Sequence, residues 1–233
     1  MLNSFDATTL STINHVFSNY WKIDTVIRFI SESNLIKGGL LILILWWAWF
    51  KKSNQRDNRI SIISTLFASI IAIFIARALA LLLPFRLRPI HQEGLDFIIP
   101  YSMDTTILDG WSSFPSDHAV LFYSLSMGVF YISKRLGVFA LIYTTLFVAL
   151  PRIYLGLHYP TDIICGAIIG IFIITVFQTA DFKKRISTPI LSFENKRPEI
   201  FYPILFLVSY QIIDLFDDFR AIALFIYEFP NYY

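Results

Sequence analysis

The sequence has little charge and almost no cysteine. Charged residues make up 15% of its 233 residues, against about 25% in globular domains, and 56% of the residues are hydrophobic. Cys165 is the single cysteine, so an internal disulfide is excluded, and its apolar surroundings do not indicate a redox compartment. The net charge of +2 is too small to predict a nucleic-acid partner. No polar segment is long enough for a second core, so we predict one domain over residues 1–233.

The hydrophobic residues gather in long runs that are separated by short, polar and basic stretches. This pattern is typical of an all-α, polytopic membrane protein, because a helix needs about 20 apolar residues to cross the bilayer core. We predict about six transmembrane helices. They cover approximately residues 36–50, 60–83, 116–133, 136–151, 162–179 and 200–213. Lys37, at the start of the first span, is expected to snorkel to the surface.

The two ends of the chain are predicted to lie outside these spans. Residues 1–34 contain Asp6, Asp24 and Glu32 and have no compact apolar region, so we predict an N-terminal outer segment and not a secretory signal. Residues 214–233 are predicted to form a C-terminal tail. The loops on one side of the spans, which include the basic stretches near 51–59 and 183–197, hold more of the 19 Lys and Arg residues than the loops on the other side. That side is predicted to be cytoplasmic, which places both termini outside.

Three polar clusters fall on the predicted outer side. The first closes the second span, the second opens the third span, and the third joins the fourth and fifth spans. Their residues are Arg77, Arg86 and Arg88-Pro89; Pro115-Ser116-Asp117-His118; and Pro151-Arg152, His158 and Asp162. Arginines, two histidines and a carboxylate at one membrane surface suit an anionic phosphate group.

The second cluster has the pattern of a helix N-terminus. Ser116 and Asp117 follow a proline at the start of an apolar run, which is typical of an N-cap. Free backbone N–H groups and the positive end of the helix dipole suit a phosphoryl group, and His118 in the first turn would face the same point. The alternative is an ordinary helix cap without a ligand.

In the third cluster, His158 and Asp162 are four residues apart on either side of a predicted helix start. Asp162 can hold one imidazole nitrogen and leave the other free to attack, while Arg152 would supply charge to the equatorial phosphoryl oxygens. The alternative for His158 is a structural histidine near the interface. Arg77 differs, because an ionisable residue inside a span is a functional candidate by default. Its alternatives are a structural ion pair or a side chain that snorkels outward.

The clusters resemble the motifs of the type 2 phosphatidic acid phosphatase superfamily, whose fold is shared with bacterial acid phosphatases and vanadium haloperoxidases. The family motifs are Lys-x6-Arg-Pro, Pro-Ser-Gly-His and Ser-Arg-x5-His-x3-Asp. This chain has Arg88-Pro89, Pro115-Ser116-Asp117-His118, and Pro151-Arg152 followed at the same spacing by His158 and Asp162. The resemblance implies a helical core of that kind.

The resemblance also implies a mechanism that needs no metal and no cofactor. His158 would attack phosphorus and form a phosphohistidine, oriented by Asp162, and His118 would protonate the leaving oxygen. The phosphoryl oxygens would be bound by Arg88, Arg152, Ser116 and the N–H of Asp117.

The chain departs from the family motifs at three positions. Leu81 stands where the family has its lysine, so Arg77 or Arg86 is expected to replace that cation, with Arg77 favoured because it lies one helical turn earlier. Asp117 replaces glycine, and its carboxylate is expected to point away from the phosphate or to contact His118. Pro151 replaces serine, which removes one hydroxyl group.

The outer site and the Pro-Ser-Asp-His variant look similar to bacterial undecaprenyl-diphosphate phosphatases. The resemblance implies a multi-pass protein of the inner membrane whose partners are the bilayer and a lipid phosphate, most simply undecaprenyl diphosphate converted to the monophosphate. Three alternatives stay open: a phosphatidylglycerophosphate or phosphatidic acid phosphatase, a lipid phosphotransferase, and a non-catalytic membrane transport or scaffold protein. The sequence does not predict an oligomeric state.

Overall fold

The computed structural model of the chain describes residues 3–17, 20–101 and 103–228. The described residues form helices and loops and contain no strand, so the predicted all-α class is confirmed. The α-helices are α1 (Ser4–Phe17), α2 (Trp21–Glu32), α3 (Leu40–Phe50), α4 (Gln55–Leu82), α5 (Asp117–Ile132), α6 (Lys134–Thr144), α7 (Leu150–Tyr154), α8 (Pro160–Phe177), α9 (Ala180–Lys196), α10 (Pro198–Ile213) and α11 (Asp217–Glu228). Two π-helical turns, η1 (Leu35–Gly39) and η3 (Thr145–Ala149), and one 3-10 turn, η2 (Pro89–His91), complete the list.

The predicted number of about six spans is not confirmed. Three helical segments of the described chain are long and apolar enough to cross a membrane: Gln55–Leu82, Lys134–Tyr154 and Pro160–Phe177. The number rises to five if two bent pairs, α2 with η1–α3 (57°) and α10 with α11 (92°), each count as one span. The remaining predicted span is α5, whose 16 residues reach only about 24 Å, less than the roughly 30 Å core of a bilayer.

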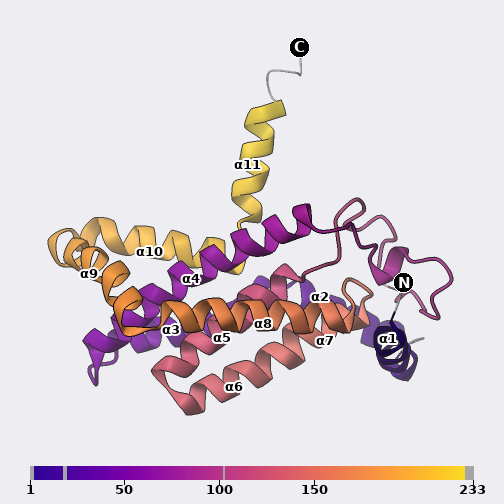
Figure 1. The fold of residues 1–233 in the computed structure, drawn as a ribbon, viewed down its shortest axis with the longest axis horizontal. Coiled ribbons are helices and arrows are strands. Elements are labelled where there is room, and N and C mark those ends of the chain that lie inside the picture. The colour runs from indigo at the N-terminus through magenta and orange to yellow at the C-terminus, as the bar shows by residue number, and fades with distance from the viewer. Residues whose placement is uncertain (1–2, 18–19, 102, 229–233) are drawn as a thin grey trace.

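Helix α5 lies at the centre of the bundle and packs against α4, α6 and α8 (Figure 1). Small residues allow the backbones of α5 and α8 to approach closely. A Cβ atom at Gly166 would lie 2.7 Å from the Ser116 carbonyl oxygen, and one at Gly170 would lie 2.2 Å from the Val120 carbonyl oxygen. These contacts fix the N-terminus of α5 beside the N-terminus of α8, and so bring the second and third polar clusters together.

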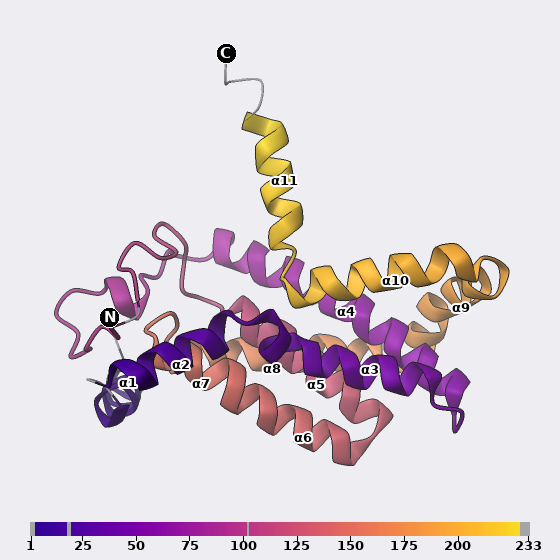
Figure 2. The same ribbon diagram turned by 180° about the vertical axis from the view of Figure 1, so that it is seen from behind.

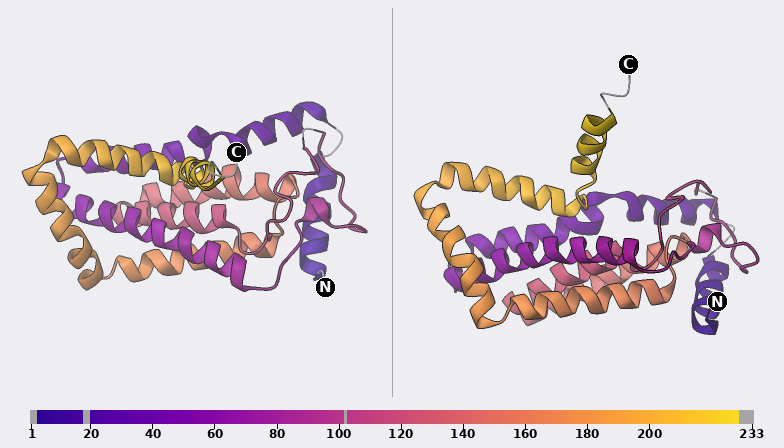
Figure 3. Two further views of the ribbon diagram at one scale, coloured as in Figure 1. Left: turned by 90° about the horizontal axis from the view of Figure 1, so that it is seen from above. Right: turned by 45° about the horizontal axis from the view of Figure 1, so that its top comes forward.

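The predicted N-terminal outer segment contains α1 and α2, which support the long loop between α4 and α5. Buried Asn14 donates to the Ile98 carbonyl oxygen and accepts from the Ile98 N–H, both at 2.8 Å. Buried Asp24 accepts from the Tyr101 N–H at 2.8 Å and from the Tyr154 hydroxyl. Both helices therefore hold the loop against one end of the bundle (Figure 3).

The segment 180–196, predicted as a basic loop, is the amphipathic helix α9. Ile186, Ile190 and Leu191 pack on the core, while Lys184, Arg185 and Lys196 are exposed. The apolar positions are too few for a membrane span, which is why the pattern of long apolar runs missed this helix. Helix α9 lies at the end of the bundle opposite α1 and the α7–α8 junction (Figure 2). The end that carries the polar clusters and the end that carries the basic helix are therefore distinct.

Candidate active site

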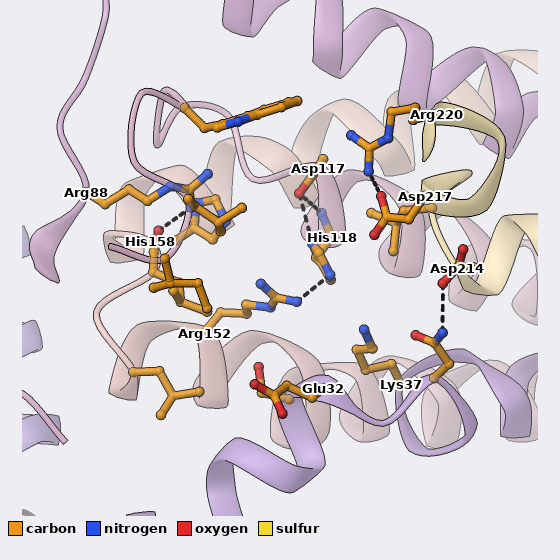
Figure 4. Close-up of a pocket in the computed structure, with 18 of the residues that line it drawn as sticks. Glu32, Lys37, Arg88, Asp117, His118, Arg152, His158, Asp214, Asp217 and Arg220 are labelled. Carbon is orange, nitrogen blue, oxygen red and sulfur yellow. Dashed lines mark hydrogen bonds and ion pairs between the residues drawn. The ribbon is translucent and has the colours of Figure 1, made fainter. Parts of the chain in front are cut away.

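A cavity of about 600 Å³ lies where the three polar clusters meet (Figure 4). Six of the nine residues predicted for the site line it: Arg77, Arg88, Asp117, His118, Arg152 and His158. The other three, Arg86, Ser116 and Asp162, lie outside the lining. The cavity is also lined by residues of α2, η1 and α11 and by apolar side chains such as Ile107 and Leu157.

His158 is held in a tight turn between α7 and α8. Gly156 adopts a left-handed conformation (φ 69°), and the Arg152 carbonyl oxygen accepts from the N–H of His158 at 3.3 Å. The imidazole Nδ1 lies 2.8 Å from the carbonyl oxygen of Ser113, which can only accept, so Nδ1 carries the proton and Nε2 holds the lone pair. Burial lowers the pKa of His158 below its ordinary value, which favours the neutral imidazole that a nucleophile requires.

Asp162 lies beside His158 but accepts no hydrogen bond from it, which corrects the expectation that it holds one imidazole nitrogen. Its Oδ2 lies 3.8 Å from His158 Nδ1, beyond hydrogen-bond distance. The same oxygen accepts from the Ser113 hydroxyl at 2.5 Å and from the Tyr159 N–H at 2.8 Å. Asp162 therefore positions Ser113, and the Ser113 carbonyl positions His158. Sequence reasoning missed Ser113, which lies in a loop outside the family motifs.

Arg86 lies outside the cavity lining and binds residues at the start of α8. Its guanidinium contacts Asp162, donates to Thr161 Oγ1 at 3.0 Å, and pairs with Asp6 Oδ2 at 2.7 Å. It also lies over the Tyr159 ring, 4.1 Å from the centroid. Asp6 is fully buried and accepts from the Thr161 N–H at 2.9 Å, so it caps the N-terminus of α8. Arg86 therefore takes a structural role, and it does not face the cavity.

Of the two candidates to replace the family lysine, Arg77 is the one that lines the cavity, and it lies on α4. Its Nη2 lies 2.6 Å from Asp117 Oδ2, and its guanidinium lies over the Trp111 ring at 5.2 Å. Leu81, at the position of the family lysine, is 87% exposed on the outside of the bundle. Arg77 therefore faces the cavity from one turn deeper in the helix, and its role as the replacement for the family lysine stays a prediction.

Asp117 contacts His118, as the sequence predicted. Its Oδ1 accepts from the backbone N–H of His118 at 2.7 Å and lies 2.9 Å from His118 Nδ1. The other ring nitrogen of His118, Nε2, contacts Arg152 Nη2. Because a guanidinium can only donate, His118 Nε2 accepts this hydrogen bond and carries no proton in this arrangement.

Ser116 and Arg88 are both buried, in different roles. Ser116 is the N-cap of α5, and its hydroxyl accepts from the Ala119 N–H at 3.4 Å, which fits the alternative of an ordinary helix cap. Arg88 is fixed by the carbonyl oxygens of Leu157 at 2.6 Å and Ser112 at 3.2 Å. Its Nη1 lies 3.3 Å from His158 Nε2, so a phosphoryl group bound to that nitrogen would contact the guanidinium.

Sequence reasoning also missed cavity residues that come from the two ends of the chain. Lys37, expected to snorkel, is 7% exposed and lines the cavity, and the predicted tail contributes Arg220. Arg220 pairs with Asp217 and lies 5.7 Å from the Trp111 ring centroid. Within the described residues, no group of three or more His, Cys, Asp or Glu side chains forms a candidate metal site.

Comparison with known proteins places these residues in a family. Residues 66–186, about half of the chain, match the PAP2 superfamily. The chain is 28% identical to the "Bacitracin transport permease protein BcrC" of Bacillus licheniformis over 72% of this chain and 77% of that protein. It is 27% identical to the "Undecaprenyl-diphosphatase BcrC" of Bacillus subtilis (strain 168) over 65% and 71%. It is 25% identical to the "Putative undecaprenyl-diphosphatase YbjG" of Escherichia coli (strain K12) over 73% and 79%.

No solved structure gives a significant match to the chain. The family match covers α5, α8 and the cavity-lining residues from Arg77 to His158. The chain therefore belongs to the PAP2 superfamily and is a lipid phosphatase.

Proposed function

We propose that the protein hydrolyses a polyprenyl diphosphate, with undecaprenyl diphosphate as the natural substrate, to the monophosphate and inorganic phosphate. Two relatives carry the name undecaprenyl-diphosphatase, which supports this substrate class. The single observation that carries the mechanism is His158, whose Nε2 faces Arg88 while Nδ1 is held by a carbonyl oxygen. The cavity lies at the end of the bundle opposite the basic helix α9, which supports an active site on the outer face of the inner membrane.

In the first step, the lone pair of His158 Nε2 forms a bond to the terminal phosphorus. The bond between that phosphorus and the bridging oxygen breaks, and its electron pair stays on the lipid monophosphate. Arg88 and Arg152 neutralise the equatorial oxygens, where the charge is greatest in the transition state. Both guanidinium groups are buried, so their interaction with the phosphoryl group is poorly screened by water.

His118 is the proposed general acid. Its Nε2 accepts from Arg152 in this structure, and a phosphoryl group that takes the Arg152 donors would release that nitrogen. Nε2 can then carry the proton that passes to the bridging oxygen, while Asp117 on the Nδ1 side stabilises the imidazolium.

The second step regenerates the enzyme. Water attacks the phosphorus of phosphohistidine 158, neutral His118 takes the proton from that water, and the bond from His158 Nε2 to phosphorus breaks. Inorganic phosphate leaves with one water oxygen incorporated. A lipid or sugar hydroxyl in place of water would make the protein a phosphotransferase, which the same site residues allow.

Phosphate release by purified protein tests this proposal. The full chain in detergent should release phosphate from a polyprenyl diphosphate in the presence of EDTA, and His158→Ala should abolish release. His15→Ala is the matched control, because His15 lies on the surface of α1 in a pair with Asp96. Normal turnover by His158→Ala, or loss of turnover with EDTA, would contradict the mechanism. Alkaline quenching followed by mass spectrometry should find phosphate on His158.

Two alternatives have specific tests. Faster turnover of phosphatidylglycerophosphate or phosphatidic acid than of the polyprenyl diphosphate would move the protein to another substrate class. The name of the Bacillus licheniformis relative indicates transport. A non-catalytic transport protein would show no phosphate release from any of these lipids.

A further inference from the structure

Lys37 is a buried cation that the reaction described above does not use. It lies in η1, at the 57° bend between α2 and α3, far from the family motifs in sequence. Its side chain is 7% exposed and lines the same cavity as His158. Among the residues that the structure describes, Lys37 Nζ forms no hydrogen bond and no ion pair.

The other cations of the cavity differ from Lys37, because each already has a partner. Arg77 pairs with Asp117 at 2.6 Å, and Arg220 pairs with Asp217. Arg88 donates to two carbonyl oxygens, and Arg152 donates to His118.

Two carboxylates of the cavity lining already have partners of their own: Asp214 accepts from Asn34 Nδ2 at 2.8 Å, and Glu32 pairs with Arg28 at 2.8 Å. The Lys37 ammonium opens onto the cavity and has no partner among the described residues, so Lys37 is suited to an anion that enters with the substrate.

The position of Lys37 indicates which anion this is. In Figure 4 the side chains of His158, His118 and Lys37 follow one another across the cavity, and the Lys37 ammonium points toward the space beside His118. The proposed reaction puts the terminal phosphate at His158 and the bridging oxygen at His118. The next group along the substrate in this direction is the phosphate that stays on the lipid.

We propose that Lys37 binds the second phosphate of a lipid diphosphate and makes the site selective for diphosphates over monophosphates. This assignment rests on the proposed function for the order of groups along the cavity. When the bond to the bridging oxygen breaks, that electron pair adds negative charge to the leaving phosphate. Lys37 would neutralise this charge without forming or breaking a covalent bond. A cavity of about 600 Å³ has room for both phosphates.

Binding of inorganic anions tests the assignment separately from turnover. Inorganic pyrophosphate and inorganic phosphate would be titrated into the full chain in detergent, in the His158→Ala background so that pyrophosphate is not cleaved. Lys37→Met should weaken pyrophosphate binding at least tenfold and phosphate binding less than threefold. Lys37→Arg, which keeps the charge, should stay within threefold of the parent for both anions. Lys22→Met is the matched control, because Lys22 is an exposed lysine of α2 outside the cavity.

Selectivity, and not the loss of binding alone, decides the outcome. Lys37→Met should weaken pyrophosphate binding by a larger factor than phosphate binding. If the first factor is less than three times the second, the assignment is wrong. If Lys37→Met does not give a monodisperse protein, Lys37→Gln is measured against the same limits. Turnover of prenyl diphosphate and prenyl monophosphate by the otherwise unaltered protein completes the experiment. A protein that binds pyrophosphate through Lys37 but cleaves neither lipid would refute the proposed function and leave this assignment standing.

Discussion

Ser113 links Asp162 to His158, and the strength of this link can be measured. The Ser113 hydroxyl donates to Asp162 at 2.5 Å, and the Ser113 carbonyl oxygen receives the His158 Nδ1 proton at 2.8 Å. Ser113→Ala removes the hydroxyl group and keeps the carbonyl oxygen. The change therefore releases the loop from Asp162 without removing the direct partner of His158.

The geometry sets the expected size of the effect. An O–H···O⁻ bond of this length is charge-assisted, and such bonds contribute about 1.5–3 kcal/mol. If all of this free energy serves to position the imidazole, kcat/KM falls by about 10- to 150-fold, since 1.4 kcal/mol is about tenfold. Asp162→Asn should cost at least as much, because it also removes the charge that faces Arg86.

A double-mutant cycle on phosphate release separates the relay from a direct role of Asp162. If Asp162 acts through Ser113, the two losses are not additive, and the coupling free energy is at least about 1 kcal/mol. Ser112→Ala is the matched control, because the Ser112 hydroxyl makes only longer contacts at 3.3 and 3.4 Å. Additive losses, or a Ser113→Ala variant as active as the control, would refute the relay.

Two further predictions concern pH and helix packing. Because burial lowers the pKa of His158 below 6.5, its neutral form persists into mildly acidic solution, so the acidic limb of kcat/KM should have its midpoint below pH 6.5. A pH profile of phosphate release with that midpoint at or above 6.5 would contradict a buried, neutral nucleophile. Gly170→Ala should destabilise the protein by about 1–3 kcal/mol, because its Cβ would lie 2.2 Å from the Val120 carbonyl oxygen. Thermal unfolding should show a smaller effect for Gly39→Ala, because the atom nearest to its Cβ is at the flexible end of the Leu35 side chain. Equal effects of the two substitutions would argue against close α5–α8 packing.

The motif spacing predicted that these residues meet at one cavity, because each motif lies at a helix boundary on the same end of the bundle. His118, Arg152 and His158 are brought together by α5 and by the α7–α8 turn. The spacing of the motifs did not distinguish Arg77 from Arg86 as the cation that faces the cavity. Arg86 lies in a loop, and its guanidinium contacts Asp162 outside the cavity lining.

The remaining site residues could not be predicted from spacing. Lys37 and Arg220 reach the cavity because the chain bends sharply beside each of them, at η1 and between α10 and α11. Ser113 acts through its carbonyl oxygen, a group that every residue carries. Asp6 caps a helix that begins more than 150 residues later, as its 155-residue separation from Thr161 records. Such contacts leave no local pattern in the sequence.

The contact of Asp6 with Thr161 has a consequence for biogenesis. Contacts between residues distant in sequence form late, because a long stretch of chain must first be made and ordered. The cap on α8, and with it the arrangement of Arg86 and Asp162, can form only after α8 has been synthesised and placed beside α1. A nascent chain that already contains His118 and Arg152 therefore still lacks the cap on α8 and the Arg86–Asp162 contact until residues 160–162 have been added.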